Sequence, residues 1–181
     1  MEGKEFDLEE HKKLVRKQLD VLIEKFEENC PPDQDQQELS NSTFRLNPFL
    51  YSGTGGYIVV YYKLYLYYER LEEIDLSLKY LNKALQALST NLSVLDRYEK
   101  KYGFLNKPSY LASGAGIYTI GALASSQVID KEATKHDTAS LLEKVEDYYD
   151  CCFEEDVEVE LMNGLAGYLY CLLAVQTKIE G

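Results

Sequence analysis

Residues 50–68, LYSGTGGYIVVYYKLYLYY, join a glycine-rich turn directly to an apolar run of helical periodicity. Two further stretches have the same layout, residues 111–123 (LASGAGIYTIGAL) and residues 161–175 (LMNGLAGYLYCLLAV). Aligned on Gly56, Gly116 and Gly167, the three copies stand 60 and 51 residues apart. A pattern that returns at such intervals is typical of helical-hairpin repeats. The sequence therefore predicts a repeat protein.

Each copy begins with a small polar residue, followed by small residues and then by a run with almost no charge. The small polar residues are Ser52, Ser113 and Asn163. Side chains of this type cap helix N-termini by accepting backbone N–H bonds, and glycine lets two backbones approach without interference from a Cβ atom. We therefore expect each copy to start a helix in a crowded place.

The helices that follow the glycine turns are expected to form an inner layer, starting near Gly55, Ser113 and Asn163. In the first of them Lys63 is the only charge between Tyr57 and Tyr68. A helix that is apolar nearly all round is buried on more than one side. Its tyrosines recur at helical spacing, as Tyr57, Tyr61, Tyr65 and Tyr68.

Amphipathic segments between the copies are expected to form an outer layer of helices, at residues 8–27, 75–88 and 133–153. Asp7 is the expected N-cap of the first. The second carries its apolar stripe at Leu78, Leu81, Leu85 and Leu88. Residues 33–43, 90–108 and 154–160 are predicted to be loops, with one short helical turn within residues 94–98. The predicted fold class is all-α, built from repeated helical hairpins in two layers.

Composition and charge exclude several classes of protein. With 181 residues, 45% of them apolar, the chain is long enough to bury a sizeable core. Its net charge of −12 repels nucleic acid and anionic membrane surfaces, and no large cluster of Lys or Arg is present.

Residues 1–48 are expected to form the N-terminal outer helix and a polar loop, and residues 49–181 the glycine-rich repeats.

The sequence favours a cytoplasmic protein. Met1 is followed by Glu2 and by alternating charges, without the apolar segment of a secretory signal. The longest uncharged run, residues 161–177, is short for a membrane span. Four cysteines at irregular spacing are typical of reduced thiols, so no disulfide is expected. Peripheral attachment to the plasma membrane stays as an alternative.

The turns read Ser52-Gly53-Thr54-Gly55-Gly56-Tyr57-Ile58, Ser113-Gly114-Ala115-Gly116-Ile117 and Asn163-Gly164-Leu165-Ala166-Gly167-Tyr168-Leu169-Tyr170. Such turns, each opening an apolar inner helix, resemble the lanthionine synthetase C-like family, eukaryotic type. In that family a G-x-x-G turn opens each inner helix of an α/α toroid of helical hairpins. Gly53/Gly56 and Gly164/Gly167 match this turn, whereas Ser113 stands where the middle copy should have its first glycine.

The resemblance covers residues 49–175 and corresponds to the N-terminal part of the family fold. It implies addition of a thiol to a dehydrated Ser or Thr in a peptide or protein, which gives a thioether. Eukaryotic members are associated with glutathione, and a zinc ion held by one Cys and a Cys-His pair activates the thiol. Those ligands belong to later repeats, and in this chain His11 and His136 follow Glu10 and Lys135. No catalytic, cofactor-binding or metal residue is therefore carried over to this chain.

Local candidates for a site have simpler structural explanations. Cys151 and Cys152 precede acidic residues, but neighbours on a helix point about 100° apart and no His lies nearby in the sequence. His11 lies on the apolar face of the first expected helix and is interpreted as a buried or bordering residue. A tyrosine stripe would suit a sugar or peptide platform, but helical spacing of aromatics favours core packing. The glycine turns lack the Lys-Ser/Thr ending of phosphate loops, and the acidic residues 154–160 resemble a solvated loop rather than a glycosidase cleft.

Two interpretations remain. The first is a fragment of a lanthionine synthetase C-like protein that lacks the C-terminal repeats and is inactive alone. The second is a non-catalytic helical-repeat module that offers an interaction surface. In both, the last inner helix would present an apolar edge, which predicts a protein partner or self-association. Neither predicts that this chain alone binds zinc.

Overall fold

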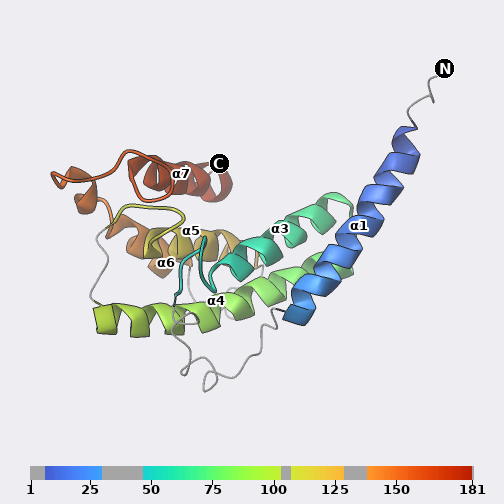
Figure 1. Cartoon of the computed structure of the whole chain (residues 1–181), viewed down its shortest axis with the longest axis horizontal. Coiled ribbons are helices and arrows are strands. Elements are labelled where there is room, and N and C mark those ends of the chain that lie inside the picture. The colour runs from blue at the N-terminus through green and yellow to red at the C-terminus, as the bar shows by residue number, and fades with distance from the viewer. Residues whose placement is uncertain (1–6, 30–46, 103–106, 129–137, 181) are drawn as a thin grey trace. The chain divides into compact units, whose positions relative to one another are not determined.

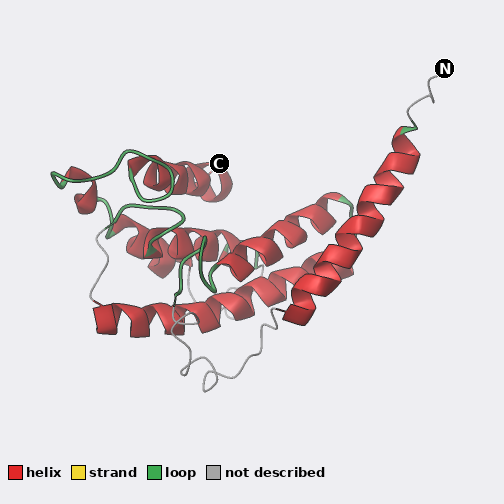
Figure 2. Cartoon of the chain, viewed as in Figure 1, coloured by secondary structure: helices red, strands yellow, loops and turns green. Residues whose placement is uncertain are grey.

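The structure is a computed structural model, and it describes residues 7–29, 47–102, 107–128 and 138–180. The chain divides into two compact units, Met1–Asp33 and Gln34–Gly181. Across the described ranges all regular elements are helical (Figure 2). The prediction of an all-α fold is confirmed.

In the first unit a single helix is described, α1 (Leu8–Asn29). The Oδ1 atom of Asp7 accepts the backbone N–H groups of Glu9 at 2.9 Å and Glu10 at 3.1 Å. Asp7 is therefore the N-cap, as its short carboxylate predicts. Leu8 and Leu22, on the predicted apolar face, are exposed.

The described residues of the second unit form five α-helices and two short helical elements. The α-helices are α3 (Gly56–Arg70), α4 (Ile74–Tyr102), α5 (Gly114–Ser125), α6 (Thr138–Glu146) and α7 (Leu165–Val175). A 3-10 helix, η3 (Asp150–Phe153), precedes α7, and a π-helical turn, η4 (Gln176–Glu180), follows it.

The three predicted inner helices and the second and third predicted outer helices fall in the second unit, where they form two layers (Figure 1). The first predicted outer helix is α1 of the first unit. The inner helices pack in chain order, since α5 contacts both α3 and α7. On the outer side α4 packs against α3 and α5, and α6 packs against α5. Only Tyr118 of α5 is not fully buried, because four helices surround this one. The first hairpin is α3 with α4, and the second is α5 with α6.

The tyrosines of α3 are core residues. Tyr61, Tyr65 and Tyr68 are buried, whereas Tyr57 is half-buried. The ring of Tyr80 from α4 stacks on Tyr68, with ring centroids 5.3 Å apart. Stacked aromatic pairs add packing energy to the burial of their surface. The predicted role of the stripe in core packing is confirmed.

The predicted end of the second outer helix is wrong, because α4 continues to Tyr102. The sequence Ser-Thr-Asn at residues 89–91 resembles a loop, yet Asn91 is buried inside the helix. Its Nδ2 group donates to the carbonyl of Pro48 at 3.0 Å and to Oγ1 of Thr54 at 2.7 Å. Tertiary contacts therefore outweigh the low helix propensity of this segment. The buried face differs from the predicted leucine stripe and comprises Ser77, Tyr80, Leu81, Ala84, Ala87, Leu88, Asn91, Val94 and Leu95.

The third outer helix, in contrast, ends earlier than predicted. Within the predicted range 133–153, α6 covers Thr138–Glu146, and residues 133–137 lie outside the described residues. After α6 the chain turns so that Tyr148 is buried while Tyr149 is exposed. The exposed, irregular segment predicted at residues 154–160 is confirmed, and the predicted loop at residues 33–43 lies outside the described residues.

Asn91 offers a test of how the outer helix holds the first turn. Asn91→Ala removes both donated hydrogen bonds and should lower the free energy of unfolding by about 1–3 kcal/mol, measured by urea denaturation. The matched control is Ser93→Ala, two residues further along α4, where the exposed hydroxyl bonds only to its own helix. Equal denaturation midpoints for the two variants would contradict the role of Asn91 in holding the first turn against α4.

Candidate functional site

The glycine turns share one close contact, between a glycine and the carbonyl group six residues before it. A Cβ atom at Gly56 would lie 2.9 Å from the oxygen of Leu50. At Gly116 the corresponding distance, to the oxygen of Tyr110, is 1.7 Å. At Gly167 it is 2.3 Å, to the oxygen of Leu161. Real Cβ atoms do not approach so closely, so each turn requires glycine for space.

The first glycine of the turn makes the same contact in two of the copies. A Cβ atom would lie 2.0 Å from the oxygen of Asn47 at Gly53, and 1.9 Å from that of Glu158 at Gly164. Two backbone hydrogen bonds per turn hold this geometry. In the first turn the N–H of Thr54 donates to the carbonyl of Asn47 at 3.0 Å, and the N–H of Gly55 donates to that of Pro48 at 3.1 Å. In the third turn the N–H of Leu165 donates to the carbonyl of Glu158 at 2.9 Å, and the N–H of Ala166 donates to that of Val159 at 3.2 Å.

The middle copy replaces its first glycine by a hydrogen-bonding serine. The hydroxyl of Ser113 donates to the carbonyl of Ser109 at 2.6 Å and accepts the N–H of Ala115 at 3.2 Å. Ser113 is therefore the N-cap of α5, as predicted. Glycine is required at the next position, Gly114, because a Cβ atom there would lie 2.3 Å from the hydroxyl of Tyr148.

The predicted caps of the other two inner helices are wrong. The N-caps of α3 and α7 are Gly55 and Gly164, and neither position has a side-chain cap. The Ser52 hydroxyl instead accepts a hydrogen bond from Nδ2 of Asn47 at 2.8 Å. The close backbone return described above occupies the space where a capping side chain would lie.

The three turns lie against one another in chain order. The N–H of Tyr51 in the first turn donates to the carbonyl of Leu111 in the second at 3.1 Å. The hydroxyl of Ser109 in the second turn donates to the carbonyl of Met162 in the third. Gly167 would place a Cβ atom 2.8 Å from the backbone nitrogen of Tyr110. We call this arrangement the turn stack; it comprises residues 47–56, 107–116 and 158–167.

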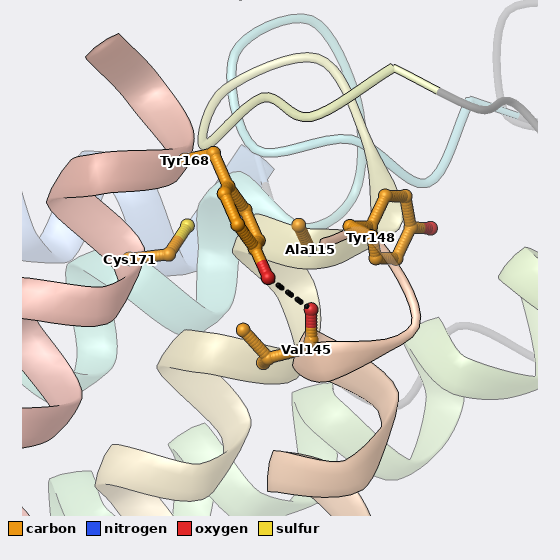
Figure 3. Close-up of a cluster of buried hydrophobic side chains, with 5 residues drawn as sticks. All are labelled: Ala115, Val145, Tyr148, Tyr168 and Cys171. Carbon is orange, nitrogen blue, oxygen red and sulfur yellow. Dashed lines mark hydrogen bonds between the residues drawn. The ribbon is translucent and has the colours of Figure 1, made fainter. Parts of the chain in front are cut away.

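Beneath the stack lies a small core shared by α5, α6 and α7. Its buried members are Ala115, Val145, Tyr148, Tyr168 and Cys171 (Figure 3). The hydroxyl of Tyr168 donates to the carbonyl of Val145 at 2.9 Å. That carbonyl lies in the last turn of α6 and also accepts the backbone N–H of Tyr148 at 3.2 Å. Tyr168 thus joins the third turn to the second hairpin.

Burial keeps the described thiols of the second unit protonated. It raises the pKa of Cys171 to about 12. The pKa of Cys151 is raised, first by burial and then by the charge of Glu154. Burial also raises the pKa of Cys152. Thiolates are the nucleophiles and metal ligands, so these environments oppose both roles.

These cysteines do not fit the zinc ion that the family resemblance implies. Within the described ranges no three His, Cys, Asp or Glu side chains lie close enough together to hold a metal ion. All three described cysteines are free, and Cys171 faces the apolar core of Figure 3. The explanation of Cys151 and Cys152 as packing or surface thiols agrees with their buried and half-buried positions.

Other candidates do not converge on a site. His11 is exposed on α1, so its interpretation as a buried or bordering residue is wrong. His136 and Cys30 lie outside the described residues. A surface depression of about 460 Å³ is lined by residues 72–76, from the turn between α3 and α4 and the first turn of α4. Its walls include neither the turn stack nor a cysteine.

The sequence analysis does not identify the residues whose carbonyl groups lie against the glycines. Leu50, Tyr110 and Leu161 stand at the same distance before Gly56, Gly116 and Gly167. The pattern of the sequence places the start of the middle copy at Leu111, one residue after the position equivalent to Leu50 and Leu161, because Tyr110 differs in type from these leucines. Extending the glycine alignment by six residues would have identified the equivalent positions.

Gly116 offers the sharpest test of the close contact. Gly116→Ala should lower the free energy of unfolding by about 3 kcal/mol, because backbone must move to admit the methyl group. The control is Gly121→Ala on the same helix, where the methyl group would meet the end of the Leu88 side chain at 2.7 Å. That leucine can adjust, so a loss below about 1 kcal/mol is expected. Equal losses of unfolding free energy in urea denaturation would contradict this account, because they would mean that the backbone of the turn adjusts as easily as a side chain.

The thiols offer a test by chemical modification. A pKa of about 12 in place of 9.0 lowers the thiolate fraction of Cys171 at pH 8 about a thousandfold. Alkylation of Cys171 by iodoacetamide, followed by mass spectrometry, should therefore be far slower than that of half-buried Cys152 and should accelerate as the pH rises. In urea the two cysteines should react alike. Equal rates in the native protein would contradict the protonated, enclosed state of Cys171.

Comparison with known proteins agrees with the architecture. The family model described as lanthionine synthetase C-like protein matches residues 45–180, which include the turn stack and every described helix of the second unit. No curated protein and no solved structure gives a match. The chain therefore belongs to the lanthionine synthetase C-like family.

Proposed function

We propose that this chain contributes the first inner helices of a protein that forms thioethers by adding a thiol, such as glutathione, to a dehydrated Ser or Thr. In such an addition sulfur bonds to the β-carbon of the dehydro residue and a proton goes to its α-carbon, so no oxidant or reductant is consumed. Family membership supports this reaction class.

The contribution proposed for this chain is positional rather than chemical. The observation that carries it is the turn stack, in which three backbone returns fix the starts of α3, α5 and α7 relative to one another. A reaction that brings a thiol against an electrophile depends on positioning of this kind. The described cysteines have raised pKa values and do not fit a zinc ion, so activation of the thiol is assigned to residues other than these.

The proposed substrates are glutathione and a dehydrated peptide or protein, and the proposed compartment is the cytoplasm. Free thiols at Cys151, Cys152 and Cys171 support a reducing compartment. In the described part of the chain, none of the helices is both long and apolar enough to cross a membrane.

A non-catalytic interaction module is the second candidate function. The observation that favours it is the exposed outward face of α7, where Leu169 and Leu173 are 56% and 49% exposed. Apolar residues gathered on one helix face often mark a protein interface.

The experiment for the first candidate uses the purified chain with glutathione and a peptide that contains dehydroalanine. We expect no thioether above the rate in buffer, and no stoichiometric zinc after dialysis. One tightly held zinc per chain, lost in Cys151→Ser or Cys171→Ser, would contradict the positional role. Mass spectrometry detects the thioether, and atomic absorption measures the metal.

The transcript separates the two candidates. Further glycine-rich repeats encoded after Gly181, with a Cys and a later Cys-His pair, would support the thioether-forming protein. A stop codon at that point, together with stable expression of the chain, would favour the interaction module.

A further inference from the structure

The first two inner helices are joined at both of their ends, and by different means. At the turn stack the N–H of Tyr51 donates to the carbonyl of Leu111, so this link is made by backbone groups. At the other end the link is made by side chains, from Tyr65 of α3 to Gln127, two residues after the end of α5. Because the two links share no residue, the second can open while the first stays closed.

The hydroxyl of Tyr65 lies within reach of two acceptors. It is 3.0 Å from Oε1 of Glu69, one turn further along α3, and 3.2 Å from Oε1 of Gln127. A hydroxyl has one hydrogen to donate. Donation to Glu69 stays within α3, whereas donation to Gln127 joins α3 to the chain after α5. The two acceptors therefore compete for one proton, and only one outcome links the helices.

The amide of Gln127 is held in its orientation by its neighbours. Its Nε2 group donates to Oγ of Ser126 at 3.0 Å, and that hydroxyl donates to the carbonyl of Leu123 at 2.9 Å. With the amide nitrogen engaged in this way, the amide oxygen is the atom that faces Tyr65. Gln127 therefore acts as an acceptor for Tyr65 and takes its proton in competition with Glu69.

The surroundings of Tyr65 keep the proton on its hydroxyl and favour Glu69. The side chain is 6% exposed, and its ring stacks on that of Tyr62 with centroids 5.9 Å apart. Burial, followed by the hydrogen bond to Glu69, raises the pKa of Tyr65 to about 12. Glu69 is exposed, and an ionised carboxylate accepts a stronger hydrogen bond than a neutral amide does. The charge of Glu69 therefore draws the proton away from Gln127.

We infer that Tyr65 is a two-position latch between α3 and α5. Its hydroxyl closes the latch when it donates to Gln127 and opens the latch when it donates to Glu69. The closed latch fixes the separation of the two helices at the end away from the turn stack, and the open latch lets these ends part with the stack as a pivot. The latch joins two inner helices and does not depend on the proposed thioether chemistry.

Hydrogen exchange after the end of α5 reports on the latch. The amides of Ser126, Gln127 and Val128 donate to carbonyls three or four residues earlier, at 2.9, 3.2 and 3.2 Å. Tyr65→Phe removes the hydroxyl and should speed exchange of these amides about three- to tenfold, as followed by NMR. The matched control is Tyr62→Phe, because Tyr62 is also buried on α3 and its hydroxyl makes no hydrogen bond among the described residues.

The turn stack separates local opening from a general loss of stability. In Tyr65→Phe the amides of Thr54 and Gly55 should exchange at the wild-type rate, because the stack keeps its backbone hydrogen bonds. If these two amides accelerate by the same factor as those after α5, the variant is destabilised throughout and the inference is wrong. The same holds if Tyr62→Phe has as large an effect as Tyr65→Phe.

Removal of Glu69 tests the competition. Glu69→Ala leaves Gln127 as the remaining one of the two acceptors and should slow exchange at residues 126–128 about two- to fivefold. In a chain that also carries Tyr65→Phe the same change should have no effect, because no hydroxyl is left to redirect. Glu143→Ala, which removes the same charge from an exposed position on α6, should alter neither rate. Faster exchange after Glu69→Ala, or an equal change with and without the hydroxyl, would overturn the inference.

Discussion

The contact between a glycine and the carbonyl six residues before it is the constraint on which the rest of the second unit depends. It brings the chain back over itself before α3, α5 and α7, at contact distances that no Cβ atom could tolerate. The same contact recurs at Gly56, Gly116 and Gly167, although α3 begins at its aligned glycine and α5 and α7 begin two residues before theirs. This shared backbone return and the contacts of α5 with α3 and α7 place the three inner helices side by side.

Side chains from the outer helices and from the segment after α6 contact the turns, and each turn has a different contact. Asn91 of α4 bonds to the first turn, and Tyr148, after α6, fills the space above Gly114. In the third copy Tyr168 reaches back to the carbonyl of Val145. The first two turns are thus contacted by a polar or aromatic side chain from another segment, whereas the third copy supplies its own tyrosine to the end of α6.

Much of the fold is readable from the sequence, and the reasons are local. Runs without charge predict α3, α5 and α7, and glycine spacing predicts their equivalence. The length of α4 was not readable, because Asn91 is helical only through its contacts with residues far away in the chain. The caps of α3 and α7 were missed because a side chain was expected where the backbone itself returns. The sequence predicts the three glycine turns but not the carbonyl groups that contact their glycines, because these belong to residues of different types, Leu50, Tyr110 and Leu161.

Hydrogen exchange of individual amides, followed by NMR, tests the central claim most directly. If the backbone returns exist in solution, the amides of Thr54, Gly55, Leu165 and Ala166 should be protected as strongly as those inside α5, because each donates to a carbonyl seven residues earlier. Exchange of these four amides at the rate of an open loop, while α5 remains protected, would contradict the account.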